Sequence, residues 1–181
     1  MIDYKLNGGQ MKLVLNREQY DKMVLVSKAC SKDKTINISL TFIKYNAEKK
    51  HIVAINGHIM RVEAMDLGDK DLLIPADILN YTVIQLKRMN NEIPLSFEES
   101  DENYPDYERV IPNSEATPIP AIGLNMDVMT DFAKTFPKNT NLKLEFFSET
   151  SAIKIFQYTL KDDDFEFTFA GVIMPTRMPI N

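Results

Sequence analysis

Few residues in this chain are suited to covalent chemistry. The 181 residues include two histidines, His51 and His58, and one cysteine, Cys30. Their spacing is not that of a zinc site, and a nucleophile with a partner base is hard to assemble from so few groups. The sequence also lacks the Gly-x-Ser-x-Gly, P-loop, Gly-x-Gly-x-x-Gly and His-Glu-x-x-His motifs. We therefore expect no catalytic residues, no metal and no cofactor.

Carboxylates offer one alternative. Acidic residues are concentrated between Glu98 and Asp106, and the alternative they offer is a metal-dependent nuclease site. A second acidic run, Asp162 to Asp164, is more typical of an exposed turn between strands. The enzyme hypothesis therefore rests on the first cluster alone.

Composition indicates a soluble globular protein. Hydrophobic residues make up 44% of the chain and charged residues 26%. The N-terminal residues do not resemble a signal peptide, and no apolar run approaches the length of a membrane span. A single cysteine fits a reducing, cytoplasmic setting. The net charge of −5 argues against a surface that binds nucleic acid everywhere, although a local basic face remains compatible with it.

Hydrophobic periodicity alternates between the strand and helix patterns. One helix is predicted after Asn16, which forms a capping box with Gln19. A second is predicted from Pro75, and a third runs from the cap Asn125 to a stop at Pro137. An Asn56-Gly57 turn predicts a hairpin. Strands are predicted at 11–15, 36–45, 51–55, 59–65, 93–97, 142–147, 153–157 and 165–173.

A strand–helix–strands unit therefore occurs clearly twice, with a partial copy between. This repetition predicts an α+β fold of antiparallel sheets with helices on one face. The predicted divisions are a domain over 1–103, a proline-rich linker over 104–120 and a half-domain over 121–181.

Four stretches resemble the bacterial DNA polymerase III beta sliding clamps. Residues 104–112, Tyr-Pro-Asp-Tyr-Glu-Arg-Val-Ile-Pro, are similar to the segment that joins the second and third clamp domains. Residues 172–178, Val-Ile-Met-Pro-Thr-Arg-Met, resemble the family's C-terminal motif. Weaker similarities lie at 55–60 and 73–76. The order along the chain also matches, so the resemblance implies DNA-clamp-like repeats in a shortened form, about half a clamp long.

In the family, these stretches form a pocket for short peptides of polymerases and the clamp loader. Ile55 and Ile59 replace the family's threonine and arginine, which makes the hairpin side more apolar. Carried over by position, the implied pocket residues are Gly57, His58, Met60, Pro105, Arg109, Val110, Val172, Met174, Pro175, Arg177 and Met178.

The resemblance also implies non-specific contact with double-stranded DNA. Clamp helices direct basic side chains toward phosphates, and the matching residues here are Lys22, Lys28, Lys87, Arg88 and Lys134. Three helices per chain would match the helix count of a family ring if four copies assembled, so a homotetrameric ring is our hypothesis. The alternative is a homologue that forms no ring and acts as a decoy or regulator of replication-protein binding.

Overall fold

Two antiparallel sheets organise the chain in this computed structural model, which describes residues 10–35, 37–89, 91–116, 122–161 and 164–176. The smaller sheet pairs β1 (Gln10–Leu15) with β6 (Ile93–Glu98). The larger has seven strands, in the spatial order β5 (Leu72–Pro75), β2 (Phe42–Asn46), β3 (His51–Ile55), β4 (Ile59–Ala64), β9 (Asp164–Ile173), β8 (Ile153–Lys161) and β7 (Asn141–Glu145). Strands β2 to β5 of the first half and strands β7 to β9 of the second half therefore share one sheet.

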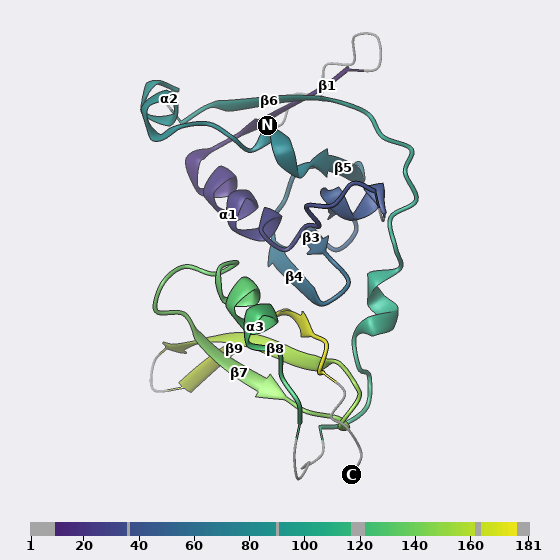
Figure 1. Cartoon of the computed structure of the whole chain (residues 1–181). Coiled ribbons are helices and arrows are strands. Elements are labelled where there is room, and N and C mark those ends of the chain that lie inside the picture. The colour runs from purple at the N-terminus through teal and green to yellow at the C-terminus, as the bar shows by residue number, and fades with distance from the viewer. Residues whose placement is uncertain (1–9, 36, 90, 117–121, 162–163, 177–181) are drawn as a thin grey trace.

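The two longer helices cover the same face of the seven-stranded sheet (Figure 1). They are α1 (Arg17–Ser27), which packs on β2, β3 and β4, and α3 (Met126–Ala133), which packs on β4 and β9. A third helix, α2 (Val83–Arg88), lies apart from them, beside the two-stranded sheet. The short 3-10 helices are η1 (Ile38–Thr41), η2 (Ala76–Ile78) and η3 (Tyr107–Val110). The predicted α+β class, with helices on one face, is confirmed.

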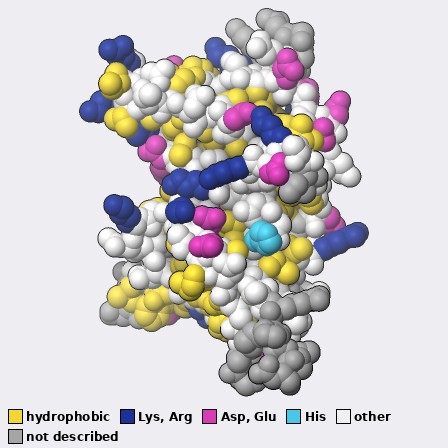
Figure 2. All heavy atoms as spheres, in the orientation of Figure 1, with side chains coloured by type: hydrophobic (Ala, Val, Ile, Leu, Met, Phe, Trp, Pro, Cys, Tyr) yellow, Lys and Arg dark blue, Asp and Glu magenta, His cyan; other side chains and the backbone are white. Residues whose placement is uncertain are grey.

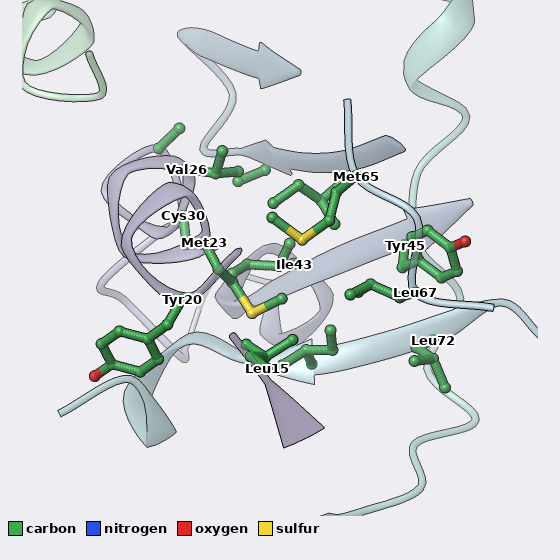
Figure 3. Close-up of a cluster of buried hydrophobic side chains, with 14 of the residues drawn as sticks. Leu15, Tyr20, Met23, Val26, Cys30, Ile43, Tyr45, Met65, Leu67 and Leu72 are labelled. Atoms are coloured by element: carbon green, nitrogen blue, oxygen red, sulfur yellow. The ribbon is translucent and has the colours of Figure 1, made fainter. Parts of the chain in front are cut away.

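The main hydrophobic core lies between the sheets and the helices. Alternate residues of β3, such as Ile52 and Ala54, point into it because strand side chains alternate between faces. Tyr20, Met23 and Val26 of α1 enter from the opposite side (Figure 3). Cys30 is buried there too, and burial raises the pKa of its thiol to about 12. This cysteine therefore remains a neutral thiol that packs as a small apolar side chain.

A second, smaller core lies on the opposite face of the same sheet. It contains the intervening residues of the central strands, Val53, Met60, Val62 and Val172. Tyr107 of η3 completes it, with Tyr104 and Ile111 packed alongside, so residues 104–111 cover this face. The second core matters most for function because it carries several of the predicted pocket residues.

The local signals for α1 and the hairpin are confirmed. The Asn16 side chain accepts a hydrogen bond from Gln19 N at 2.8 Å, and the Gln19 side chain accepts one from Asn16 N at 3.0 Å. These two bonds satisfy backbone donors that the first helical turn leaves free. The Asn56-Gly57 turn connects β3 to β4 as predicted, with Gly57 at φ +92°.

Several predicted boundaries were wrong, among them the end of β8, which continues past the predicted residue 157 to Lys161. The strand predicted at 36–45 begins at Phe42, because the Asn37 side chain accepts a hydrogen bond from Ser39 N (3.0 Å) and caps η1 instead. Pro75 ends β5 and does not start a helix; the cap of the second helix is Thr82, paired with Gln85. The third helix ends at Ala133, before Pro137. Ile36 lies outside the described residues.

Candidate functional site: a groove beside the second core

The turn between β3 and β4 forms one side of the candidate site. Asn56 Oδ1 accepts hydrogen bonds from His58 N (3.0 Å) and Ile59 N (3.1 Å), which hold the turn closed. Met174 N donates to the His58 carbonyl at 2.9 Å, so the segment after β9 runs beside this turn. The structure therefore brings together residues 57–58 and Met174, which are far apart in sequence.

Strands β4 and β9 connect the two halves of the chain. Their paired residues are Ile59 with Ile173, Met60 with Val172, and Arg61 with Gly171. The two backbones lie so close that a Cβ atom built on Gly171 would stand 1.9 Å from the Met60 carbonyl oxygen. Gly171 also has φ +151°, which other residues rarely adopt. We call this pairing of β4 with β9 the seam, and only glycine fits at this point of it.

Two tyrosines hold residues 104–107 over the second core. Tyr104 Oη donates to the Val53 carbonyl oxygen at 3.3 Å, and Tyr107 Oη lies 2.8 Å from His51 Nε2. Burial raises the pKa of both phenols, so they remain neutral. Beneath them Met60 and Val172 are only 1% and 2% exposed. These two predicted pocket residues therefore support the site from below and are not available to a ligand.

An open groove of about 560 Å³ lies beside this covered region. Val110 and Met174 are 43% and 38% exposed within it, so together they offer an apolar surface to a ligand. The Arg109 side chain extends into solvent, with Nε 2.9 Å from Asp106 Oδ2. The groove is lined by residues 108–114, residues 150–152 and Met174. It combines an apolar surface with an accessible guanidinium group.

The predicted pocket residues divide into four groups. Arg109, Val110 and Met174 line the groove, while Gly57 and His58 are exposed at the adjoining turn. Met60 and Val172 are buried, as described. Pro105 is exposed and Pro175 half-buried, and neither lines the groove. Arg177 and Met178 lie outside the described residues.

One wall of the groove was not predicted from the sequence. It is the loop between β7 and β8, which contributes residues 150–152. Ser148 Oγ accepts a hydrogen bond from Ser151 N at 2.9 Å and lies 2.6 Å from Ser151 Oγ, which fixes the loop conformation. The Ser148-x-x-Ser151 spacing was the available signal, because serine side chains often close turns in this way.

The three helices carry the residues predicted to face DNA. Lys22 is paired with Glu18 at 3.0 Å, and Lys134 with Asp131 at 2.8 Å. Lys28, at the end of α1, makes no ion pair with any residue that the structure describes, and the same holds for Lys87 and Arg88 of α2. On the face shown in Figure 2, the basic side chains of the described residues are interspersed with acidic ones and form no dense patch.

We expect the contact between His51 and Tyr107 to be sensitive to pH. Burial, and then the charge of Lys49, lowers the pKa of His51 below its usual 6.5. The unfolded chain therefore binds a proton at a pH where the folded chain does not, and stability falls as pH drops below about 6.5. We expect the melting temperature to decrease from pH 7.5 to pH 5.5, and to decrease less in His51→Gln, whose amide can still bond to Tyr107. Equal decreases in both proteins would contradict this role for His51.

Solved structures share this architecture. The DNA polymerase sliding clamp of Bacillus subtilis aligns at 13% identity with a TM-score of 0.64, over 99% of this chain and 67% of that one. The beta subunit of Thermotoga maritima DNA polymerase III aligns at 15% identity with a TM-score of 0.66, over 99% and 68%. The chain has the sliding-clamp fold. The resemblance predicted from residues 104–112 and 172–178 is thereby confirmed at the level of the fold.

The clamp fold is recognisable here by structure and not by overall sequence. No protein-family model and no curated protein matches the sequence. The chain spans about two thirds of the length of the solved clamps. A C. crescentus sliding clamp, 12% identical with a TM-score of 0.66 over 97% of this chain and 68% of that one, was solved with polyethylene glycol at its proposed beta-motif tethering region.

Neither a metal cluster nor a membrane-spanning helix occurs in the described part of the chain. Among those residues, no group of three or more His, Cys, Asp or Glu side chains is placed to hold a metal ion. Over the same ranges, no helix is long and apolar enough to cross a membrane.

Proposed function

We propose that this protein is a sliding-clamp-like scaffold of DNA replication that binds short peptide motifs of a polymerase or clamp loader. The observation that carries the proposal is the groove beside the second core, whose lining includes Arg109, Val110 and Met174. Each comes from a stretch that resembles a clamp motif. The protein would act by holding its partners at DNA and not by catalysing a reaction.

The chemistry of the groove suits a peptide with apolar anchors. A methionine side chain is flexible and adapts to leucine or aromatic groups, and Val110 offers a second apolar contact. The Arg109 guanidinium can donate to peptide carbonyls or carboxylates. Two residues that line the groove, Ile111 and Ala152, pack in the second core together with Met60 and Val172, so this side of the groove has a buried support.

Peptide binding tests the proposal directly. We expect a fluorescent clamp-binding peptide to bind the protein, and Met174→Ala to weaken binding about tenfold, because removing an anchor contact in an interface typically costs about 1–2 kcal/mol. Arg109→Ala should weaken binding as well. Fluorescence anisotropy measures both effects.

The matched control for the groove methionine is Met126→Ala. Met126 is 72% exposed at the start of α3 and does not line the groove. Its substitution should leave the affinity unchanged. No binding by the parent protein, or equal losses in both methionine variants, would contradict the proposal.

We further propose that the three helices face double-stranded DNA in a homo-oligomeric ring. Lys22, Lys28 and Lys134 would contact phosphates from α1 and α3, while Lys87 and Arg88 would do so from α2, without reading the base sequence. Four copies would supply twelve helices if each chain contributes α1, α2 and α3. Light scattering that detects only a monomer would rule out the ring, and a multimer retained on circular but not linear DNA would support it.

A further inference from the structure

A second groove lies on another part of the molecule, between the end of β5 and the segment that follows β6. Its volume is about 710 Å³, and it shares no lining residue with the first groove. Its floor is apolar: Phe97 is buried, Phe42 and Ile78 are half-buried, and Ile38 is 45% exposed. An isoleucine this accessible, set in a hollow beside other apolar residues, is a surface suited to a ligand.

The wall of this groove is strongly acidic. Five carboxylates line it, and no lysine or arginine among the described residues does. Asp77 is paired with Lys34 at 2.9 Å, and Glu99 with Lys70. The remaining three, Glu98, Asp101 and Glu102, are exposed and make no ion pair with the described residues. Their negative charge is therefore available to a cation beside an apolar floor.

The position of the wall follows from the fold. Glu98 ends β6, and the chain then continues past β5, the edge strand of the large sheet. Residues 99–102 also line a smaller hollow of about 210 Å³ on the β5 side. In Figure 2 acidic side chains gather at the upper right, the side on which the chain leaves β6 in Figure 1.

We propose that this second groove docks a cationic, amphipathic peptide segment of a partner protein. Apolar side chains of the segment would cover Ile38, Phe42 and Ile78, while its lysines or arginines would pair with Glu98, Asp101 and Glu102. Charge complementarity of this kind speeds encounter and excludes acidic competitors. The protein would then hold two partners, or two parts of one partner, at separate sites.

Other ligand classes fit this groove less well. DNA phosphates would be repelled by the carboxylates. A metal ion would leave the apolar floor uncovered, and the described residues include no suitable group of three metal-binding side chains. A neutral apolar peptide would be forced to lie beside unpaired carboxylates and remove water from them. A segment with both apolar and basic residues can cover the apolar floor and pair with the carboxylates of the wall.

The test is binding of a labelled synthetic peptide of roughly 15 residues, with leucine at helical spacing and lysine elsewhere. We expect the full chain to bind it, and the triple variant Glu98→Gln/Asp101→Asn/Glu102→Gln to bind about tenfold more weakly. Ile38→Ser should also weaken binding. A peptide with serine in place of leucine should likewise bind poorly, because it offers no apolar side chains to the floor. An excess of unlabelled clamp-binding peptide should not compete, which separates this site from the first groove.

The matched control removes three exposed carboxylates elsewhere, Glu48→Gln/Glu115→Gln/Glu149→Gln, and changes the net charge equally. It should retain the parent affinity. Equal losses in the two triple variants would show attraction to the overall charge and overturn the proposal, as would equal binding of the leucine-free peptide. Thermal melting of each variant shows whether it is folded, and no large change is expected because the substituted side chains are exposed.

Discussion

Gly171→Ala should destabilise the protein strongly, because the added methyl group has no room. The new Cβ would lie 1.9 Å from the Met60 carbonyl oxygen. That oxygen belongs to the backbone of β4, which pairing with β9 holds in place. The clash can be relieved only by separating β4 from β9, where the halves of the sheet join. We expect a loss of about 3 kcal/mol or more, since overpacking against the backbone exceeds the usual cost in a yielding core. The measurement is chemical denaturation monitored by circular dichroism.

The matched control is Gly57→Ala. Gly57 also has a positive φ, +92°, but a Cβ there would meet no described atom within 4 Å. Its substitution carries only the conformational penalty, about 1 kcal/mol. A small effect at Gly171, or equal losses at the two glycines, would contradict the close contact between β4 and β9.

Arg61→Ala is expected to have the second largest effect on stability. The Arg61 side chain is buried, donates to the Ala170 carbonyl oxygen at 3.2 Å and places Cζ 4.3 Å from the centre of the Phe136 ring. It is also paired with Glu63, which Lys22 approaches only to 3.7 Å. Truncation leaves a cavity at the seam and removes the main partner of a half-buried carboxylate. We expect a loss of about 3 kcal/mol in denaturant unfolding.

Arg61→Met distinguishes packing from charge at this position. Burial lowers the pKa of Arg61, because removing the guanidinium from water is unfavourable, and its Nε has no hydrogen-bond partner among the described residues. Methionine fills similar space but, like alanine, leaves Glu63 without its main partner, so we expect its loss to be smaller than that of Arg61→Ala by about 1–2 kcal/mol, the part due to the cavity. If the methionine variant is as unstable as the alanine variant, the ionic contacts of Arg61 dominate over its packing.

Features set by neighbouring residues could be predicted from the sequence. The capping box of Asn16 and Gln19 and the Asn56-Gly57 turn depend on contacts within three residues, and both formed as expected. Where two local signals competed, as at the start of the second helix, the prediction was wrong. Pro75 suits the first turn of a helix, but it lies in β5, and Thr82 with Gln85 supplied the actual cap.

The candidate site could be predicted only in part, because distant contacts decide which residues are accessible. The motif resemblance pointed to Met60 and Met174 alike, yet Met60 lies beneath Tyr104 and Tyr107 while Met174 is open. The loop over 150–152 carries no clamp-like motif and was missed. The pairing of β4 with β9, which creates the seam, leaves no trace in local periodicity.

The shared sheet also has a consequence for synthesis of the chain. β4 lacks its partner on one side until β9 has been made, and the paired residues Ile59 and Ile173 are separated by more than half of the sequence. During translation the nascent first half would therefore expose an unpaired strand edge beside apolar side chains, a surface prone to aggregation. Closing so distant a contact is slow. We therefore expect ribosome-bound chains that stop before β9 to bind chaperones. Full-length chains released from the ribosome should not bind them.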